Sequence, residues 1–230
     1  MATFEEQIEG LTGLTIDASS APKQSEISEF LRDGVLEVTS RCLAAKPEES
    51  INFIRVSSEQ TSNNSLDLNG TTIISVVREA ETNDDWRECR PIPPSLQNRV
   101  TDKTSIHYAS SYNPAYTVLE DGKINVYPTP GSSTKAFKVY YVNNQPVNGS
   151  GVTLVYSHDD LGFFPEPKKY LVVLYASIKA LEHKMGTYTI DQEDIELVES
   201  LGANITSLKQ QYETAFAAMY PPQKAQKGAQ

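Results

Sequence analysis

The residues best suited to chemistry in this sequence are His158, Asp159 and Asp160, which follow one another in the chain. An imidazole and two carboxylates are side chains that bind divalent cations or transfer protons. A metal site needs further ligands from elsewhere in the fold, however, and the other two histidines, His107 and His183, lie in unrelated sequence contexts. We therefore interpret the three residues as part of a turn that leads into a helix, and we predict no metal site and no catalytic site.

The short motifs that bind nucleotides or activate a serine are missing from the sequence. It has no phosphate-binding loop, no Gly-x-Ser-x-Gly elbow and no dinucleotide fingerprint. The two cysteines, Cys42 and Cys89, match neither a disulfide framework nor zinc-ligand spacing, so we expect reduced, structural thiols. We predict that the protein uses no cofactor and is not an enzyme, and that its function depends on its architecture and its surfaces.

The composition is that of a folded, water-soluble protein. Hydrophobic residues make up 39% of the chain and charged residues 22%, which is ordinary for a globular protein. No apolar run reaches the roughly 18 residues of a membrane span, and the N-terminus is acidic where a signal peptide is basic. We therefore expect synthesis in the cytoplasm and no membrane partner. The net charge of −10 argues against a surface that grips nucleic acid, because phosphate binding needs clustered Lys and Arg.

Apolar residues that recur every three or four positions predict three long helices. Each such stripe needs an apolar partner, so we expect the three helices to bury one another. The stripes are Ile27, Leu31, Val35, Val38, Cys42 and Ala45 in the first helix; Leu171, Leu174, Ile178, Leu181 and Met185 in the second; and Val198, Leu201, Ile205, Leu208, Tyr212, Ala215 and Met219 in the third.

Between the first and second helices the apolar period changes to two, which predicts strands. Glu120-Asp121-Gly122 predicts the turn of a hairpin, because Asp-Gly supplies the positive φ angles that tight turns require. We expect the strands to form an antiparallel meander, and we expect the polar segments 57–65 and 143–151 to be mobile loops. The predicted strands span residues 51–56, 72–77, 116–119, 123–127 and 136–142, with a further edge strand at 154–156.

The predicted fold class is α+β, with an antiparallel helical bundle of three main helices and an inserted antiparallel β-rich region. In this prediction the bundle comprises residues 22–48 and 163–220, and the insertion comprises residues 49–162. Residues 1–21 form an N-terminal arm, with a short helix around Phe4–Ile8, that frays or reaches a neighbouring subunit. Residues 221–230 form a polar, flexible tail.

Tyrosines crowd the β-rich region, and two of them are informative by position. Tyr140 and Tyr141 are adjacent in a predicted strand, so they face opposite sides of the sheet and cannot both enter one core. Tyrosine is common in protein–protein interfaces. The pair therefore indicates either an interaction surface or packing between sheets.

The layout of the chain resembles the head-to-tail connector proteins of tailed bacteriophages, which are adaptors that dock beneath the portal. The resemblance covers most of the chain and rests on the order of its parts. These parts are the helix before Pro47, the Trp86–Pro94 segment, the hairpin followed by Tyr127-Pro128-Thr129-Pro130, the strand Val139-Tyr140-Tyr141-Val142 and the helix Pro165–Met185.

This resemblance implies a virion structural protein that assembles as a dodecameric ring at the head–tail junction. Its partners would be copies of itself, the portal protein, and tail or neck proteins, and DNA would pass through the ring without specific binding. A C-terminal segment often contacts the portal in such proteins. By position, that role falls here on Phe216, Met219, Tyr220, Lys224 and Lys227, with Tyr140 and Tyr141 as further interface candidates.

The charge distribution is compatible with DNA passage. Residues 1–48 and 164–220 together carry 17 acidic and 9 basic residues, whereas residues 49–163 carry 13 and 9. An acidic helical surface repels the phosphate backbone and lets DNA slide. Two alternatives remain open: another phage tail or baseplate structural protein, and a small ligand-binding module built around His158 and the neighbouring carboxylates.

Overall fold

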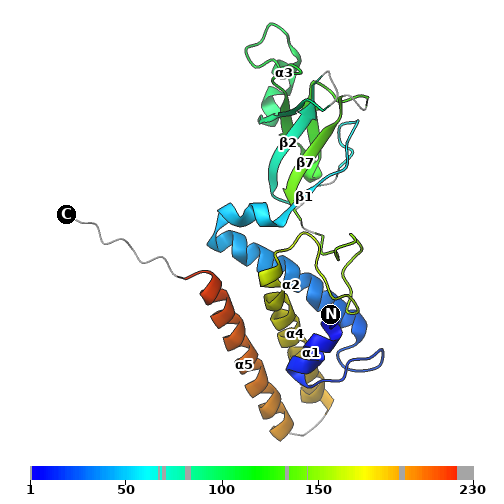
Figure 1. Ribbon diagram of the computed structural model, residues 1–230, viewed down its shortest axis with the longest axis vertical. Helices are drawn as coiled ribbons and strands as arrows, with labels where there is room; N and C mark the ends of the chain where they lie inside the picture. The colour runs from blue at the N-terminus through cyan, green and yellow to red at the C-terminus, as the bar shows by residue number, and fades with distance from the viewer. Residues whose placement is uncertain are drawn as a thin grey trace, which may run out of the picture. The chain divides into compact units, whose positions relative to one another are not determined.

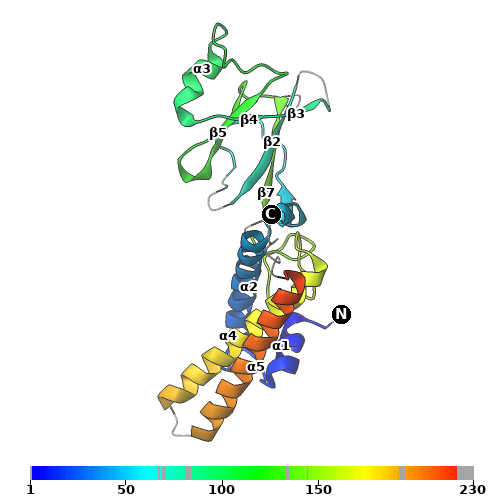
Figure 2. The ribbon, with the colours of Figure 1, turned by 90° about the vertical axis from the view of Figure 1, so that its left-hand side faces the viewer.

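The computed structural model describes residues 2–66, 68, 71–80, 84–132, 135–143, 145–191 and 195–221. The chain divides into two compact units, which we call the helical unit (residues 1–52 and 145–230) and the β unit (residues 53–144). Helices dominate the first unit and strands the second (Figures 1 and 2), so the predicted α+β class is confirmed.

Helix α4 is the centre of the helical unit, because α1, α2 and α5 all pack against it (Figure 1). The sequence predicted three main helices, and α1 is an additional one. Within the described residues, no helix is both long enough and apolar enough to cross a lipid bilayer. The helices are α1 (Phe4–Thr12), α2 (Gln24–Ala45), the 3-10 helices η1 (Pro47–Phe53) and η5 (Glu166–Lys168), α4 (Lys169–Asp191) and α5 (Ile195–Met219).

The short helix predicted around Phe4–Ile8 is present as α1, and it packs against α4 of its own unit, so this part of residues 1–21 does not form a frayed arm. Phe4 and Ile8 are four residues apart on α1, so they lie on the same face of the helix. Both are buried. The backbone N–H of Phe4 also donates to the carbonyl of His158 at 2.8 Å. Apolar burial and backbone hydrogen bonds together fix the start of the chain.

The predicted apolar stripes on α2 and α4 are buried except at their last members, since Ala45 is exposed and Met185 is half-buried. A glycine lets these two helices approach closely. A Cβ placed on Gly34 of α2 would lie 3.0 Å from Cδ1 of Tyr175 and 3.3 Å from the carbonyl oxygen of Val172, both on α4. Any larger residue needs room that α4 occupies. The glycine that weakens α2 as an isolated helix therefore permits its packing.

The β unit contains two sheets that enclose one core. The four-stranded sheet has the order β1-β7-β2-β3 and is antiparallel throughout, whereas the three-stranded sheet has the order β4-β5-β6 with β4 and β5 parallel. Phe137 and Val139 from the first sheet pack with Ile124 and Val126 from the second. The strands are β1 (Ile54–Val56), β2 (Ile73–Glu79), β3 (Trp86–Glu88), β4 (Arg90–Pro91), β5 (Ala115–Val118), β6 (Ile124–Tyr127) and β7 (Phe137–Val142).

Two predictions about these strands have different outcomes. The β5–β6 hairpin is confirmed, with Gly122 at φ 69° in its turn, η3 (Glu120–Gly122). The single meander is wrong, because β7 leaves the hairpin and inserts between β1 and β2. Its alternating pattern of Phe137, Val139 and Tyr141 fits a central strand as well as it fits a third meander strand, so periodicity could not decide its neighbours. The predicted strand over residues 51–56 is also shortened, since η1 extends to Phe53.

The polar segment 57–65, predicted to be a mobile loop, is tied to both sheets. The backbone of Gln60 pairs in both directions with Phe137 at 2.9 Å. The side chain of Asn63 accepts from the backbone N–H of Val126 at 2.9 Å. The backbone of Gln60 and the side chain of Asn63 thus make hydrogen bonds like those of a neighbouring strand, and they connect β7 with β6.

The β unit is shorter than the predicted insertion over 49–162, because it begins later in the chain and ends earlier. Its limits are Phe53 and Asn144, and residues 145–162 belong to the helical unit. That segment was predicted to contain a mobile loop and an edge strand. It instead makes an isolated bridge between Val147 and Thr153 and buries Leu154 completely.

Helix α3 (Gln97–Thr101), preceded by the 3-10 helix η2 (Pro94–Leu96), completes the β unit. Val100 of α3 packs with Ile92, Ala109, Ala115 and Tyr127 in a second, smaller core. The helix therefore lies against the three-stranded sheet.

Candidate interaction site at the end of helix α5

The described part of helix α5 buries one apolar stripe. Leu201, Ile205, Leu208 and Tyr212 are spaced four, three and four residues apart, so they lie on one face of the helix. The stripe stops after Tyr212, and Phe216 is half-buried. Other interactions must therefore hold the last two turns of α5.

Arg41 of α2 holds the first of these turns. Its Nη1 donates to Oε1 of Glu213 at 2.8 Å and its Nη2 donates to Oε2, so the pair is bidentate. The same guanidinium lies 4.2 Å from the ring centroid of Phe216 and 5.2 Å from that of Tyr212. Hydrogen bonds from Arg41 hold the pKa of Glu213 below its ordinary value. Arg41 thus connects α2 to a carboxylate and two rings of α5.

Glu49, Lys168 and Tyr220 hold the next turn, and we call them the polar cluster. The hydroxyl of Tyr220 donates to Oε2 of Glu49 at 2.6 Å. Lys168 Nζ donates to the same carboxylate oxygen and to the Tyr220 hydroxyl. Lys168 is only 8% exposed, so its charge is compensated by a carboxylate rather than by water. The cluster joins η1, η5 and the end of α5.

The pKa values of the polar cluster follow from these contacts. Burial alone raises the pKa of Glu49, but hydrogen bonds from Lys168 and Tyr220 and the charges of Lys168 and Lys46 outweigh it, so the pKa lies below its ordinary value. Burial, the neighbouring Cys42 thiol and Glu49 together raise the pKa of Tyr220. Near neutral pH, Glu49 is therefore a carboxylate and Tyr220 a neutral donor, an arrangement that positions a helix end.

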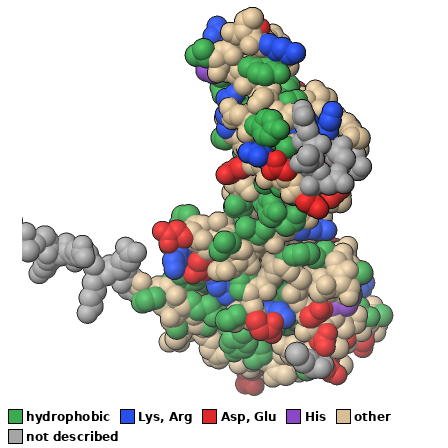
Figure 3. All heavy atoms as spheres, turned by 45° about the horizontal axis from the view of Figure 1, so that its top comes forward, with side chains coloured by type: hydrophobic (Ala, Val, Ile, Leu, Met, Phe, Trp, Pro, Cys, Tyr) green, Lys and Arg blue, Asp and Glu red, His purple; other side chains and the backbone are tan. Residues whose placement is uncertain are grey.

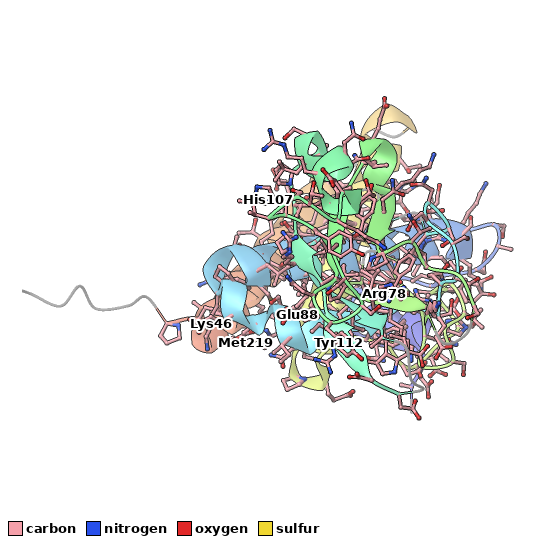
Figure 4. The ribbon with its side chains drawn as sticks, turned by 90° about the horizontal axis from the view of Figure 1, so that it is seen from above. Lys46, Arg78, Glu88, His107, Tyr112 and Met219 are labelled. Atoms are coloured by element: carbon pink, nitrogen blue, oxygen red, sulfur yellow. The ribbon has the colours of Figure 1, made fainter. Side chains whose placement is uncertain are left out.

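A hollow of about 520 Å³ lies beside the polar cluster, between the end of α5 and the α2–η1 junction. Polar and apolar groups contribute about equally to its lining. Lys46 and Met219, which both line it, are labelled in Figure 4. We call it the α5 hollow, and its lining includes Ala45, Pro47, Glu48, Met219, Tyr220 and Pro221.

The structure brings together three of the predicted interface residues, Phe216, Met219 and Tyr220. The Phe216 and Tyr220 ring centroids are 4.9 Å apart, and Met219 and Tyr220 line the α5 hollow. Lys224 and Lys227, together with nearly all of the predicted tail 221–230, lie outside the described residues.

The two predicted tyrosines of the β unit do not share a surface. Tyr141 is 8% exposed and packs in the core between the sheets, so it is not available as an interface residue. Tyr140 is half-buried on the opposite face of β7, as strand alternation requires. Only Tyr140 of this pair is left as an interface candidate.

His158 and Asp160, which the sequence singled out for possible chemistry, make hydrogen bonds within a loop. The Nδ1 atom of His158 accepts from the backbone N–H of Val155 at 3.3 Å, and its Nε2 lies 3.5 Å from Nδ2 of Asn148. Asp160 accepts from the backbone N–H of Gly149 at 2.9 Å. No group of three potential His, Cys, Asp or Glu metal ligands occurs among the residues that the structure describes.

Three residues that hold this site were missed by the sequence reasoning: Arg41, Glu49 and Lys168. Each lies next to a predicted helix stripe or at a helix boundary, where a charged residue is ordinarily solvated. Their partners come from distant parts of the chain, and no local pattern signals such pairing. The third predicted stripe ends with Ala215 and Met219, which are less bulky or less strictly buried than the leucines and isoleucine before them. That change in residue type was the indication in the sequence that α5 ends at a partly exposed surface.

Comparison with known proteins adds no relatives to this picture. No protein-family model and no curated protein matches the chain.

Proposed function

We propose that this protein is a non-enzymatic connector of a tailed bacteriophage, which forms a ring between the portal and the tail. In this proposal it is made in the host cytoplasm and becomes part of the head–tail junction of the virion. Its partners are other copies of the chain, the portal protein and tail or neck proteins, and DNA passes through the ring without specific binding.

The observation that carries this proposal is a β unit inserted into a helical unit between α2 and α4. The chain enters the β unit through β1 and leaves it through β7, and these strands pair with Ile54 opposite Val142. The N–H of Asn143 also donates to the carbonyl of Phe53 at 3.0 Å. The insertion thus leaves and rejoins the helical unit through adjacent strands, which is the layout that the connector resemblance implies.

The charge of the helical unit supports passive DNA passage. Figure 3 shows acidic side chains scattered over the face of the helical unit that it presents. Several cations of this unit are already paired with carboxylates, including Arg41, Lys168 and Lys209. Cations held in ion pairs contribute little to phosphate binding, so a surface of this kind does not retain DNA.

The end of α5 supports a role in portal contact. Phe216, Met219 and Tyr220 form a partly exposed apolar surface whose positions are fixed by Arg41 and the polar cluster. A surface that is already ordered loses little conformational entropy when a partner binds. The sequence that follows contains two lysines, Lys224 and Lys227, which are also predicted to contact the portal.

Sedimentation velocity of the purified chain, alone and with the portal protein of the same phage, tests the proposal. We expect a monomer or weak oligomer alone, and a ring that cosediments with the portal in the mixture. Met219→Asp should weaken that binding, whereas Val152→Asp, a substitution at an exposed residue away from the α5 hollow, should not. Failure to bind the portal at any concentration, or turnover of a substrate by the isolated chain, contradicts the connector function.

A further inference from the structure

The last two turns of α5, residues 213–220, are attached to the helical unit differently from the part of the helix before them, and we call them the α5 latch. Before the latch, an apolar stripe from Leu201 to Tyr212 is buried. Within the latch, every side chain is exposed or half-buried. Tyr212 therefore divides α5 into a part that apolar burial holds and a part that a few polar and ring contacts hold.

The contact between the latch and Arg41 of α2 breaks without leaving a buried charge. Arg41 donates to Glu213 and lies over the ring of Phe216. The side chains of Arg41 and Glu213 are already 30% and 61% exposed, so water solvates both charges when they separate. Pairs between exposed charges contribute little to stability. The Arg41 contact therefore positions the latch at a low cost of release.

The polar cluster also tolerates release of the latch. Of its three members only Tyr220 belongs to α5, because Glu49 lies on η1 and Lys168 on η5. Lys168 donates directly to Glu49, so this ion pair persists when the tyrosine leaves. Breaking a buried ion pair is costly because it leaves a charge without a partner. Opening of the latch avoids that cost and loses only the hydrogen bonds of Tyr220.

The closed latch covers the thiol of Cys42. This cysteine lies near the end of α2 and is completely buried. Its thiol is a hydrogen-bonding neighbour of the Tyr220 hydroxyl. Movement of Tyr220 away from η1 therefore uncovers Cys42, and the reactivity of this thiol reports the state of the latch.

We propose that the α5 latch opens and closes as a unit while the rest of the helical unit stays folded, and that only the closed latch presents the portal-binding surface. This inference rests on the proposed function and adds a means of regulating it. In the closed form the rings of Phe216 and Tyr220 lie 4.9 Å apart, beside Met219. Opening separates these residues from their supports, so the apparent affinity for the portal falls with the fraction of closed chains.

Thiol labelling of two single-cysteine proteins tests the motion. Cys89→Ala leaves Cys42 as the only thiol and reports the latch. A second protein combines Cys42→Ala and Cys89→Ala with Ser177→Cys, at a fully buried position of α4, and reports unfolding of the helical unit. Both full-length proteins are treated with N-ethylmaleimide, and the labelling rates are measured by mass spectrometry at increasing urea concentrations.

We expect Cys42 to be labelled at least about tenfold faster than the cysteine at position 177, because local opening is more frequent than unfolding of the unit. The rate for Cys42 should also depend less on urea, since opening a helix end exposes less surface. Tyr220→Phe should accelerate labelling of Cys42 by about tenfold or more. Glu213→Gln should accelerate it about twofold, because that pair is exposed.

Glu199→Gln, at an exposed carboxylate of α5 before the latch, is the control and should not change the labelling of Cys42. None of these three substitutions should change labelling at position 177. Equal rates and equal urea dependence for the two reporter thiols overturn the inference, as does unchanged labelling of Cys42 in Tyr220→Phe. If Ser177→Cys does not fold, amide exchange of the unmodified protein makes the same comparison between residues 213–220 and α4.

Labelling of Cys42 with saturating portal protein separates this inference from the proposed function. Slower labelling in the complex supports both, because the portal then binds only the closed latch. Local opening in a chain that does not bind the portal supports the motion and contradicts the connector role. A portal complex in which Cys42 is labelled as fast as in the free chain supports the connector role and overturns the inference.

Discussion

The hydroxyl of Tyr220 donates a 2.6 Å hydrogen bond to the carboxylate of Glu49, a residue 171 positions earlier in the chain. Lys168 donates to both groups, so one buried cation fixes the end of α5 to η1. Apolar burial along α5 stops at Tyr212. The surface that we propose for portal contact is therefore positioned by side-chain hydrogen bonds.

Tyr220→Phe should loosen the end of α5 without unfolding the protein. The substitution removes the donor to Glu49, and a hydrogen bond to a charged group contributes about 1.5–3 kcal/mol. Amide hydrogen exchange should accelerate between residues 213 and 220 and stay unchanged in α4. Tyr170→Phe, at an exposed tyrosine, is the control and should alter neither. Equal exchange in the two variants would mean that other contacts hold the helix end.

The polar cluster predicts a loss of stability in acid. The pKa of Glu49 is lower in the folded protein than the ordinary 4.5, so the folded state binds fewer protons than the unfolded state. The stabilisation from Glu49 is therefore complete well above pH 4.5 and disappears as the pH falls through the folded pKa. Glu213, whose pKa is lowered mainly by hydrogen bonds from Arg41, adds a loss in the same direction.

Urea unfolding between pH 7 and pH 3 measures this dependence. Glu49→Gln should be less stable than the unmodified protein at pH 7, and it should lose less further stability as the pH falls, because the group that titrates is gone. Glu199→Gln, at an exposed carboxylate of α5, should follow the unmodified protein across the range. Parallel curves for all three proteins would show that the cluster contributes no proton linkage.

Leu174→Asp should unfold the helical unit. Leu174 is fully buried on α4, the helix against which α1, α2 and α5 all pack, so a carboxylate there has no water and no charge partner. The cost of several kcal/mol is comparable with the whole stability of a typical domain. Leu36→Asp, at a partly exposed position of α2, should retain the native circular dichroism spectrum. A folded Leu174→Asp protein would contradict the assignment of α4 as the centre.

Helices of this chain were predictable because their stripes are local and long. Leu171, Leu174 and Leu181 repeat over three turns, and this repetition identifies a buried face whatever its partner is. Strand neighbours were not predictable, because the alternation of Phe137, Val139 and Tyr141 is the same in an edge strand and a central one. The position of β7 between β1 and β2 depends on pairing across the whole unit.

The candidate site was predicted in part. Phe216, Met219 and Tyr220 followed from their position near the C-terminus, and the structure brings them together beside the α5 hollow. Tyr141 was misplaced because adjacent tyrosines show that two faces are used, but not which face is the core. Lys168 was missed because a lysine near a helix start is usually solvated, and its burial depends on Glu49 and Tyr220 from distant segments.

Asn63→Ala should release the segment that connects the two sheets. The Asn63 side chain accepts from the N–H of Val126 at 2.9 Å and lies 3.4 Å from its carbonyl oxygen, so it takes the place of a strand neighbour for β6. Loss of the acceptor leaves that N–H unpaired, at a cost of about 1–3 kcal/mol. Limited proteolysis should cut within residues 57–65 faster, with Gln60→Ala as the milder control because Gln60 pairs through its backbone.

Gly34→Ala should destabilise the helical unit even though alanine is the better helix former. Alanine gains about 1 kcal/mol in helix propensity. Its Cβ would lie 3.0 Å from Tyr175 Cδ1 and 3.3 Å from the Val172 carbonyl oxygen, and the backbone oxygen cannot move without shifting α4. Overpacking of this kind costs about 1–3 kcal/mol, so we expect a net loss of stability.

Gly202→Ala is the matched control, because a Cβ on Gly202 of α5 meets nothing within 4 Å and the substitution should raise stability. Thermal unfolding should therefore shift in opposite directions for the two variants, and an increase for Gly34→Ala would show that α2 and α4 have room between them.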